Sequence, residues 1–301
     1  MKKMLFVINP NSGKAQIKNV LLSIIQTFSN AGYVVTVYPT KSTLDCFDYV
    51  TETEGMFDVI VCSGGDGTFN ETVAAVMGFS GEKPPVGYIP SGTTNDFAVS
   101  LSIPKDMKKA AEHIAVGIPR KCDVGVFNGR SFNYIAAFGA FTDVAYQTKQ
   151  NMKNILGHQA YILEAVKRLA FLKSYKMKVT YEDGIITDEF MYGMISNTKS
   201  VGGMKGLVGK SVKLNDGLFE VTLIKQPKNA LDFQQLLSGF LTQSIIDKDM
   251  VYSFKTSKLL IESETNITWT LDGEFGGEND RVEFNVAVDG IELILKKHEL
   301  R

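Results

Sequence analysis

The sequence lacks any apolar run long enough to span a bilayer, and it has almost no net charge. Its 301 residues include 32 Lys and Arg and 33 Asp and Glu, so the formal net charge is −1. A protein that binds nucleic acid by neutralising phosphates needs a basic excess, which is missing here. The apolar run Met4 to Ile8, after two lysines, is too short for a signal peptide. We therefore expect a soluble, cytoplasmic protein without a nucleic-acid partner.

Cysteine and histidine are also scarce and scattered. The three cysteines are Cys46, Cys62 and Cys122, and the three histidines are His113, His158 and His298. The cysteines lack metal-ligand spacing, so we expect reduced thiols in the core rather than disulfides or a zinc site. The histidines are isolated from one another, and no nucleophile elbow lies near them, which leaves no basis for serine or histidine chemistry.

Apolar residues make up 44% of the chain, enough for full cores in two domains. In the first 122 residues, short β-branched runs alternate with amphipathic stretches, which predicts a doubly wound parallel sheet covered by helices on both faces. The expected strands are Met4 to Ile8, Tyr33 to Tyr38, Val59 to Cys62 and Val86 to Ile89. The expected helices are Ala15 to Ala31, Leu44 to Thr53, Phe69 to Met77, Asn95 to Leu101 and Met107 to Val116.

Residues 123–301 have a different pattern and predict a β-rich, sandwich-like second domain. Hairpin signals occur at Asn128-Gly129 and Asp183-Gly184. Expected strands are 123–127, 130–137, 176–181, 185–195, 218–225, 258–262, 266–271, 281–288 and 291–295, with long helices only at 154–174 and 231–246. The return of the last residues to the first domain is left open.

Glycine-rich loops follow three of the predicted parallel strands. They are Asn9 to Lys14, Ser63 to Thr68 and Pro90 to Asp96, and each opens a helix. Such turns lie at the carboxyl edge of a parallel sheet, where glycine permits close backbone approach and helix N-termini attract anions. One such loop is a weak signal, but three at one edge predict a polyphosphate site.

An acidic residue, Asp66, lies inside the second loop. A bare carboxylate would repel phosphate, so Asp66 is expected to act through a divalent cation. The alternative is that Asp66 caps the helix that begins near Thr68, and the two roles are compatible. Lys14 is a minor candidate, because a solvated lysine in a helix's first turn is commonplace.

These motifs resemble the diacylglycerol kinase catalytic-domain family, in particular its soluble bacterial lipid kinases, along the whole chain. The matching elements are Asn9 to Gly13, Gly64 to Thr68 with Asn70 and Glu71, Pro90 to Ala98, Gly202-Gly203, Asn215 to Leu218 and Leu271 to Glu274. The resemblance implies an ATP- and Mg²⁺-dependent enzyme that transfers the γ-phosphoryl group to a lipid hydroxyl, with ATP between the domains. The implied nucleotide contacts are Asn9, Pro10, Asn11, Ser12, Gly13, Thr40, Gly64, Gly65, Asp66, Gly67, Thr68, Asn70, Glu71, Gly92, Thr93 and Asn95.

The sequence departs from the family pattern after Thr40. Family members often carry a small residue and His-Ala a few positions later, whereas Cys46 and Phe47 follow here. The resemblance at Thr40 therefore rests on fewer matching residues than at the glycine loops. The resemblance also implies a structural magnesium held by Asp216 and the carbonyl groups of Lys213 and Leu218; from the residues alone, Asn-Asp-Gly is simply a turn.

Two carboxylates, Asp272 and Glu274, flank Gly273 after an apolar strand. Phosphoryl transfer uses a carboxylate near the attacking hydroxyl, but most Asp-Gly pairs are hairpin turns. The residue pattern leaves both interpretations open, and the resemblance favours Glu274 as the proton acceptor, with Asp272 as the second candidate. Asp66 completes the expected catalytic set.

Residues 167–178 alternate basic and apolar side chains and could contact anionic lipid headgroups. The competing interpretation is a helix over the sandwich with a solvated basic end. We expect a diacylglycerol kinase that meets its lipid at the inner membrane face. Alternatives are a kinase of phosphatidylglycerol or a sphingoid base, a dinucleotide kinase, or a catalytically silent nucleotide-binding regulator. Acyl preference, physiological pathway and oligomeric state, a homodimer included, stay open.

Overall fold

The computed structural model describes residues 1–93, 95–139, 173–197, 214–228, 232 and 249–296. The chain divides into two compact units. Unit 1 comprises Met1–Val124, Lys213–Gly217 and Ala287–Arg301, and unit 2 comprises Gly125–Val212 and Leu218–Val286. Among the described residues, no helix is long and apolar enough to cross a membrane.

Unit 1 is built on a parallel sheet with the strand order β2–β1–β3–β4. The strands are β1 (Lys2–Ile8), β2 (Tyr33–Pro39), β3 (Val59–Gly64) and β4 (Val86–Pro90). Every residue of β3 and β4 is buried, as expected for strands covered on both faces. The C-terminal end of β13 (Glu274–Leu295) pairs with β4 in parallel at Leu293 and Val86.

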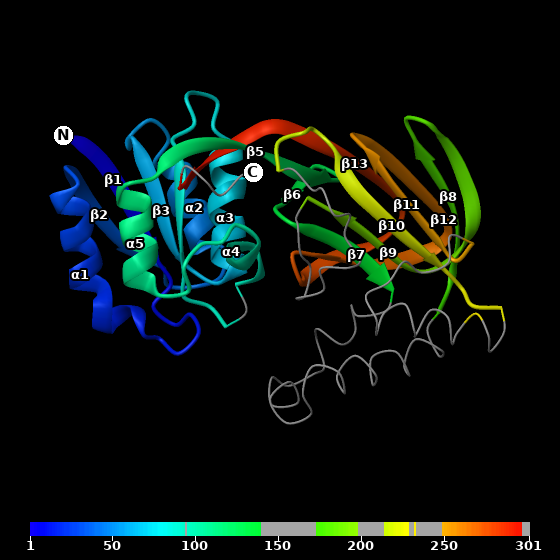
Figure 1. The fold of residues 1–301 in the computed structure, drawn as a ribbon, viewed down its shortest axis with the longest axis horizontal. Helices are drawn as coiled ribbons and strands as arrows, with labels where there is room; N and C mark the ends of the chain where they lie inside the picture. The colour runs from blue at the N-terminus through cyan, green and yellow to red at the C-terminus, as the bar shows by residue number, and fades with distance from the viewer. Residues whose placement is uncertain (94, 140–172, 198–213, 229–231, 233–248, 297–301) are drawn as a thin grey trace. The chain divides into compact units, whose positions relative to one another are not determined.

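Five helices accompany this sheet in the described part of unit 1, and four of them pack in two pairs. They are α1 (Ile17–Asn30), α2 (Asp45–Glu52), α3 (Asp66–Met77), α4 (Asp96–Ser100) and α5 (Met107–Ala115). Helix α1 packs on α5, and α2 packs on α3; Figure 1 shows α1 and α5 in front of the strands. The predicted alternation of parallel strands and helices is confirmed.

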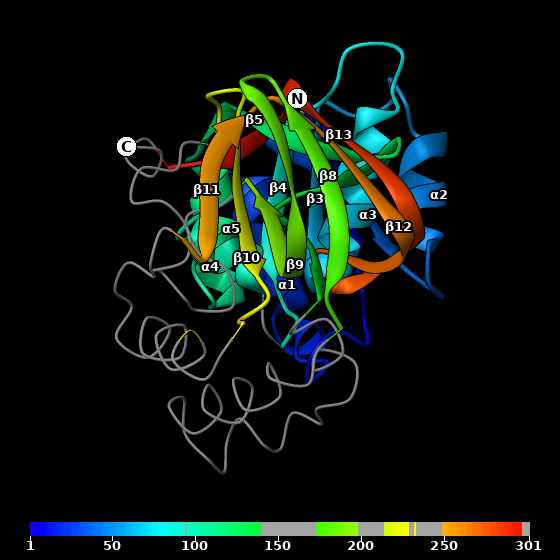
Figure 2. The ribbon, with the colours of Figure 1, turned by 90° about the vertical axis from the view of Figure 1, so that its right-hand side faces the viewer.

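Unit 2 is an antiparallel sheet with the order β11–β10–β9–β7–β12–β13, in which β8 pairs with both β12 and β9. Figure 2 shows β8, β9, β10 and β11 facing the viewer. The predicted β-rich second domain is confirmed. Its strands are β5 (Ile118–Phe127, which begins in unit 1), β6 (Arg130–Phe132), β7 (Ile135–Gly139), β8 (Tyr175–Tyr181), β9 (Gly184–Ser196), β10 (Phe219–Lys225), β11 (Val251–Thr256) and β12 (Lys258–Leu271).

The sheet of unit 2 folds back on itself. The first halves of β9 and β12 pair with β8, and their second halves pair with β7. A register shift in β12 between Glu262 and Ile267 accompanies the change of partner. The enclosed core centres on Trp269, whose ring meets those of Phe127, Phe138 and Phe284 edge-on at 5.4, 4.9 and 5.4 Å. Apolar burial around these rings stabilises the unit.

Several predicted boundaries differ from the structure. The strand expected at 130–137 is two strands, because the backbone at 133–135 turns aside to meet the Asp272 carboxylate. The two pieces expected at 258–271 form the single strand β12, and those expected at 281–295 form part of β13. Strand β11 was not predicted. The long helices expected at 154–174 and 231–246 lie almost entirely outside the described residues.

Candidate functional site

The three glycine-rich loops of unit 1 meet at the carboxyl edge of its sheet. The Asn9 amide donates to the Ser63 carbonyl oxygen at 2.8 Å, which joins the first loop to the second. The amides of Ser91 and Gly92 donate to the Gly64 carbonyl oxygen at 2.8 and 3.1 Å, which joins the third loop to the second. The structure therefore brings together the loops that the sequence placed on one edge.

Glycine is required where these backbones approach most closely. A Cβ on Gly92 would lie 2.5 Å from the Gly65 Cα, and a Cβ on Gly13 would lie 2.3 Å from the Ser91 carbonyl oxygen. Gly13 also has φ +57°, a conformation that disfavours other residues. By contrast, a Cβ on Gly65 would meet only ordinary contacts, 3.6 Å from the Gly92 Cα and 3.9 Å from the Ser12 Oγ. Packing of the loops therefore does not by itself require glycine at position 65.

Asp66 contacts a different helix from the one suggested by the sequence. Its own helix, α3, has Gly65 as N-cap without a side-chain hydrogen bond. The Asp66 carboxylate instead accepts from the amides of Asp96 at 3.1 Å and Phe97 at 3.4 Å, the first residues of α4. The capping interpretation was correct in kind but wrong in its helix, because sequence proximity favoured α3 whereas the folded loops present α4.

Three other expected nucleotide contacts make hydrogen bonds within unit 1. Asn95, with φ +50°, accepts from the Gly92 amide at 3.0 Å and donates to the Gly92 carbonyl oxygen at 2.8 Å. The Asn9 amide group donates to the Thr68 Oγ1 at 3.3 Å. Glu71 accepts from the Leu44 amide at 3.2 Å. These side chains shape the loops, and the roles predicted for them at a nucleotide stay predictions.

The remaining expected contacts lie on the same edge with differing exposure. Thr40 is buried and follows β2, where its amide donates to the Ile8 carbonyl oxygen at 2.8 Å. Ser12 and Asn70 are also buried. Pro10 and Gly67 are half-buried, and Asn11, Lys14 and Thr93 are exposed.

The three thiols of the chain, and the Tyr88 hydroxyl beside the loops, are buried. The Cys46 Sγ is 3.2 Å from the Thr72 Oγ1, and burial raises its pKa to about 12. Burial likewise raises the pKa of Cys122 to about 12 and that of Cys62 further. Burial together with the charge of Asp66 raises the pKa of the Tyr88 hydroxyl, which contacts Gly64 and Asn95. All three cysteines are free and buried, which confirms that they are core residues.

The acidic hairpin of unit 2 joins β12 to β13 through the two-residue turn Asp272-Gly273. Both residues have positive φ, +52° and +84°, as in a type I′ hairpin turn. The Asp272 carboxylate accepts from the amides of Asn133 at 2.6 Å, Tyr134 at 3.0 Å and Ile135 at 3.0 Å. Asp272 is 7% exposed, so both of its oxygens are used inside the fold.

Glu274 has a different environment two positions later. Its side chain is exposed, and the following Phe275 is 53% exposed. The two carboxylates of the Asp-Gly-Glu element thus separate into one that holds a loop and one that faces solvent. Only the second is open to an incoming hydroxyl group.

The turn expected to hold a structural metal is fixed by a buried acid that the sequence reasoning missed. Asp123, 4% exposed, accepts from the amides of Gly217 at 2.7 Å and Asp289 at 2.9 Å, and its own amide donates to the Leu214 carbonyl oxygen at 2.8 Å. Asp216 lies on this turn and is half-buried, as is Leu218. Lys213 and the pair Gly202-Gly203 lie outside the described residues. Within the described part of the chain, no three His, Cys, Asp or Glu side chains group as a metal site.

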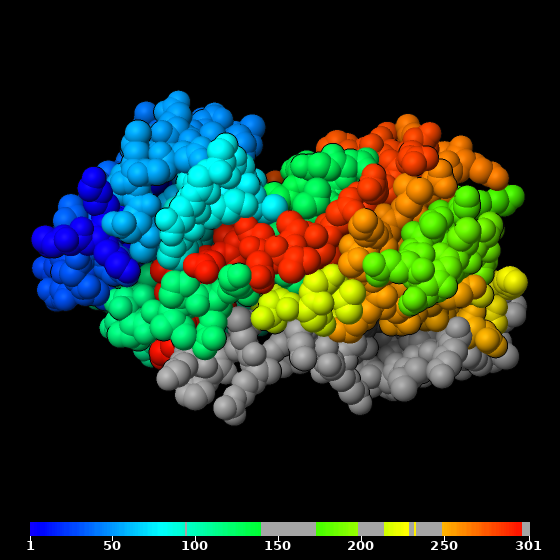
Figure 3. Space-filling model, turned by 90° about the horizontal axis from the view of Figure 1, so that it is seen from above, coloured from blue at the N-terminus to red at the C-terminus, as the bar shows by residue number. Residues whose placement is uncertain are grey.

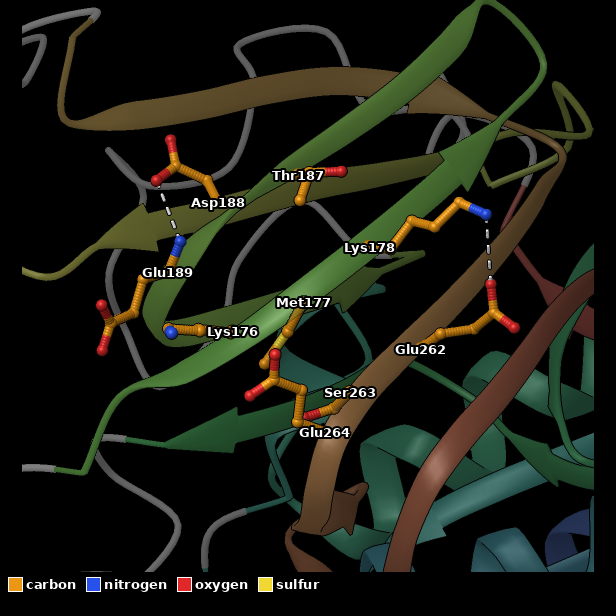
Figure 4. A pocket seen from close by; sticks show the side chains of 9 residues that line it. All are labelled: Lys176, Met177, Lys178, Thr187, Asp188, Glu189, Glu262, Ser263 and Glu264. Carbon is orange, nitrogen blue, oxygen red and sulfur yellow. Dashed lines mark hydrogen bonds and ion pairs between the residues drawn. The ribbon is translucent and has the colours of Figure 1, made fainter.

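A pocket of about 490 Å³ lies on the outer face of unit 2, on β8, β9 and β12 (Figure 4). Figure 3 shows atoms of β8 and β12 close together in unit 2, in agreement with the pairing of these strands. The pocket is lined by Lys176, Met177, Lys178, Thr187, Asp188, Glu189, Glu262, Ser263 and Glu264. Four of these are acidic, and Lys178 pairs with Glu262 at 3.7 Å. These acidic neighbours weaken the hypothesis that Lys176 and Lys178 contact anionic lipid headgroups. The rest of the basic segment, residues 167–172, lies outside the described residues.

Sequence reasoning also missed Asn133, Tyr134 and Tyr88, which contact the predicted site residues directly. No local pattern marks them, because their partners lie far away in the chain. His113 is buried in α5, consistent with an ordinary helix histidine. His158 and His298 lie outside the described residues.

Comparisons with known proteins agree with the two units. Residues 3–127 match the diacylglycerol kinase catalytic domain, and residues 137–293 match the YegS C-terminal NAD kinase β-sandwich-like domain. A diacylglycerol kinase of Bacillus subtilis (strain 168) is 33% identical over 92% of this chain and 91% of its own length. A diacylglycerol kinase of Staphylococcus aureus (strain MRSA252) is 31% identical over 92% of this chain and 87% of its own length.

Solved structures share the fold. A crystal structure of a diacylglycerol kinase from Bacillus anthracis str. Sterne superposes with a TM-score of 0.78 at 20% identity, covering 99% of this chain and 98% of its own. A second structure from that organism superposes with a TM-score of 0.82 at 23% identity, and the match covers 99% of this chain and 96% of the other. Together with the curated relatives, these matches confirm the resemblance that the glycine loops indicated. The chain belongs to the diacylglycerol kinase catalytic-domain family.

Proposed function

We propose that this protein is an ATP-dependent lipid kinase that transfers the γ-phosphoryl group of ATP to diacylglycerol, giving phosphatidate. The observation that carries the proposal is the junction of three glycine loops. At this junction Gly65 leaves open the space of a side chain, although the packing of the loops would allow a methyl group there. The curated relatives are diacylglycerol kinases that match over 92% of this chain. The acceptor of this chain is inferred from them.

In this proposal the loops bind the phosphate groups of ATP. Backbone amides at the start of α3 point away from the helix and provide donors for anionic oxygens. The first amides of α4 are already bound by the Asp66 carboxylate. Gly65 and Gly92 allow the phosphates to approach the backbone, and Ser12 and Thr68 add hydroxyl groups to the same loops. The remaining contacts proposed for the nucleotide are Asn9, Pro10, Asn11, Gly13, Thr40, Gly64, Gly67, Asn70, Glu71, Thr93 and Asn95.

Asp66 is the residue we assign to the catalytic magnesium ion. Its carboxylate is half-buried beside the phosphate loops and supplies the hard oxygen ligands that Mg²⁺ prefers. When bound, the ion neutralises charge on the transferring phosphoryl group. Because Asp66 also caps α4, the same side chain fixes the third loop relative to the second.

A second, structural magnesium ion is proposed at Asp216, with the carbonyl oxygens of Lys213 and Leu218. The donor set is all oxygen, which suits this ion. Asp123 supports the assignment, because its carboxylate holds the turn that carries Asp216 in place. Such an ion would stabilise the protein without taking part in phosphoryl transfer.

Glu274 is the residue we assign as proton acceptor. A lipid hydroxyl must lose its proton as it attacks the γ-phosphorus, and an exposed carboxylate can take that proton. Asp272 is the weaker candidate, because its two oxygens already accept three backbone hydrogen bonds. Since the acceptor lipid resides in a membrane, we propose that the reaction takes place at the cytoplasmic membrane surface.

The proposal is tested by incubating the protein with γ-labelled ATP, magnesium and a total lipid extract, followed by product identification by mass spectrometry. Labelled phosphatidate is the expected product. Label in phosphorylated phosphatidylglycerol or in a phosphorylated sphingoid base would show that the acceptor is that lipid and not diacylglycerol. In a second assay with an added dinucleotide, label in the dinucleotide would show that the protein is a dinucleotide kinase. ATP binding without any labelled product would identify a nucleotide-binding regulator instead.

A further inference from the structure

Two side chains from the segment before β7 hold the backbone on either side of Glu274. The Tyr134 hydroxyl donates to the Asp272 carbonyl oxygen at 3.2 Å. The Arg130 Nη1 donates to the Phe275 carbonyl oxygen at 3.2 Å. Glu274 lies between these two carbonyl groups in the chain. Both donors therefore act on the backbone that carries the proposed base.

The turn that precedes Glu274 needs such support. Asp272 has φ +52°, which costs free energy for a residue with a side chain, and the next residue is the flexible Gly273 at φ +84°. A general base must lie within hydrogen-bond reach of the proton it removes. The pairing of Glu274 with Leu271 fixes the start of β13, but small shifts of the turn would still move the exposed carboxylate away from a productive position.

Tyr134 is well suited to fix this turn because it is fixed itself. The residue is 6% exposed, and its amide donates to the Asp272 carboxylate at 3.0 Å. The Asp272 amide in turn donates to the Ile135 carbonyl oxygen at 2.8 Å. Tyr134 thus contacts both the side chain and the carbonyl group of Asp272. Arg130 is exposed, so the hydrogen bond of its side chain to Phe275 competes with water and contributes less.

We propose that Tyr134 and Arg130 are positioning residues for Glu274, with Tyr134 the more important. They do not touch substrate; they restrict the backbone from Asp272 to Phe275 so that the Glu274 carboxylate faces the acceptor hydroxyl group. This assignment rests on the proposed function, in which Glu274 accepts the proton. It also gives Asp272 a role other than catalysis, because its carboxylate fixes the segment from which Tyr134 projects.

The test is a kinetic comparison of single variants with diacylglycerol as acceptor. Tyr134→Phe removes only the hydroxyl group and should lower kcat about tenfold, since small misplacements of a catalytic group are costly. The KM for ATP should not change. Arg130→Met should lower kcat by about two- to threefold. Tyr181→Phe is the matched control: its ring stacks on Phe254 in the same unit, and kcat should equal that of the wild type.

A double-mutant comparison separates positioning from general loss of structure. In a Glu274→Gln background, Tyr134→Phe should lower the residual kcat no further, because there is no base left to position. An unchanged kcat in Tyr134→Phe alone, or the same tenfold loss in both backgrounds, would overturn the assignment while wild-type activity still supports the proposed function. A wild type that transfers nothing to diacylglycerol would contradict the proposed function, and this assignment with it.

Discussion

Asp272 and Glu274 show how two carboxylates two positions apart can be given different tasks. Asp272 accepts three backbone hydrogen bonds and is buried, whereas Glu274 is exposed at the start of β13. The sequence presents both as acids around a glycine and cannot separate them. The distinguishing partners, at 133–135, lie more than 130 residues away along the chain, so only the folded protein shows which acid is free to react.

Glu274→Gln should lower kcat by about 10²–10⁴, because glutamine keeps the shape of the side chain but cannot accept a proton at neutral pH. The KM for ATP should hardly change. Glu278→Gln, an exposed residue on the same strand, is the control and should retain wild-type kcat. Single-turnover phosphorylation of diacylglycerol makes the comparison. Equal rates for Glu274→Gln and wild type would remove Glu274 from the mechanism.

Asp66→Asn should lower turnover by about 10²-fold or more and raise the magnesium concentration needed, because it removes the charge that binds the ion. Asp66→Ala also removes the cap of α4, which should cost about 0.5–2 kcal/mol of unfolding free energy. Asp106→Ala removes the cap of α5 at a distance from the loops, so it should lose comparable stability but no turnover. Near-normal turnover of Asp66→Asn would leave Asp66 with the capping role alone.

At the level of elements, Gly65→Ala tests whether the glycine loops bind phosphate. The new methyl group would make only ordinary contacts, so the unfolding free energy should fall by no more than about 1 kcal/mol, because alanine is a poorer N-cap for α3 than glycine. The KM for ATP should nevertheless rise about tenfold or more, because the methyl group occupies space proposed for phosphate oxygens. Gly92→Ala, with its 2.5 Å approach to Gly65, should lose about 1–3 kcal/mol of stability as well. An unchanged KM in Gly65→Ala would refute a phosphate role for this loop.

Asp216→Ala should reduce the rise in melting temperature that magnesium causes, because one of the few proposed ligands of the structural ion is lost. Melting curves of wild type and variant across a magnesium titration provide the measurement. Asn215→Ala, on the exposed side of the same turn, is the control and should behave as wild type. Identical curves for Asp216→Ala and wild type would mean that this segment is only a turn held by Asp123.

The sequence predicted elements where a local pattern determines them and missed those determined by distant partners. The four parallel strands of unit 1 follow from apolar runs bounded by turn residues, and the hairpin turn at Asn128-Gly129 follows from turn chemistry. The second hairpin forms as expected, but its turn is Glu182-Asp183 and not Asp183-Gly184, because Gly184 pairs with Tyr181 as the first residue of β9. The break between β6 and β7 depends on the Asp272 carboxylate, and the cap of α4 depends on Asp66. Strand β11 does alternate between more buried and exposed positions from Tyr252 to Thr256, but it is only six residues long and its local pattern was overlooked.

For the whole molecule, stability should fall as pH rises from about 9 to 12. Burial raises the pKa of Cys46 and Cys122 from 9.0 to about 12, and that of Cys62 further. In this range the unfolded thiols have released protons that the folded thiols still bind, so deprotonation favours the unfolded state. Denaturant midpoints at several pH values measure how steeply the unfolding free energy falls with pH. Cys46→Ala should make this fall less steep. A slope that Cys46→Ala leaves unchanged would exclude a contribution from this thiol.

Family membership and the two-unit architecture could be predicted from the sequence because the glycine motifs and the change from helix-rich to strand-rich texture are both local. The use of each acid could not be predicted, since it depends on which backbone amides the fold brings to it. Asp66, Asp123 and Asp272 all accept amides from segments at least 30 positions away. The residues that support a site are therefore harder to find than the residues that form it.

The most direct test of the account is a reaction of the wild-type protein with diacylglycerol vesicles, ATP and magnesium, in which the lipid product is identified by mass. We predict phosphatidate that carries the γ-phosphoryl group of ATP, formed only with magnesium present and greatly slowed in Glu274→Gln. ATP that binds and is not transferred to diacylglycerol, under conditions where the protein is folded and magnesium is saturating, would contradict the account.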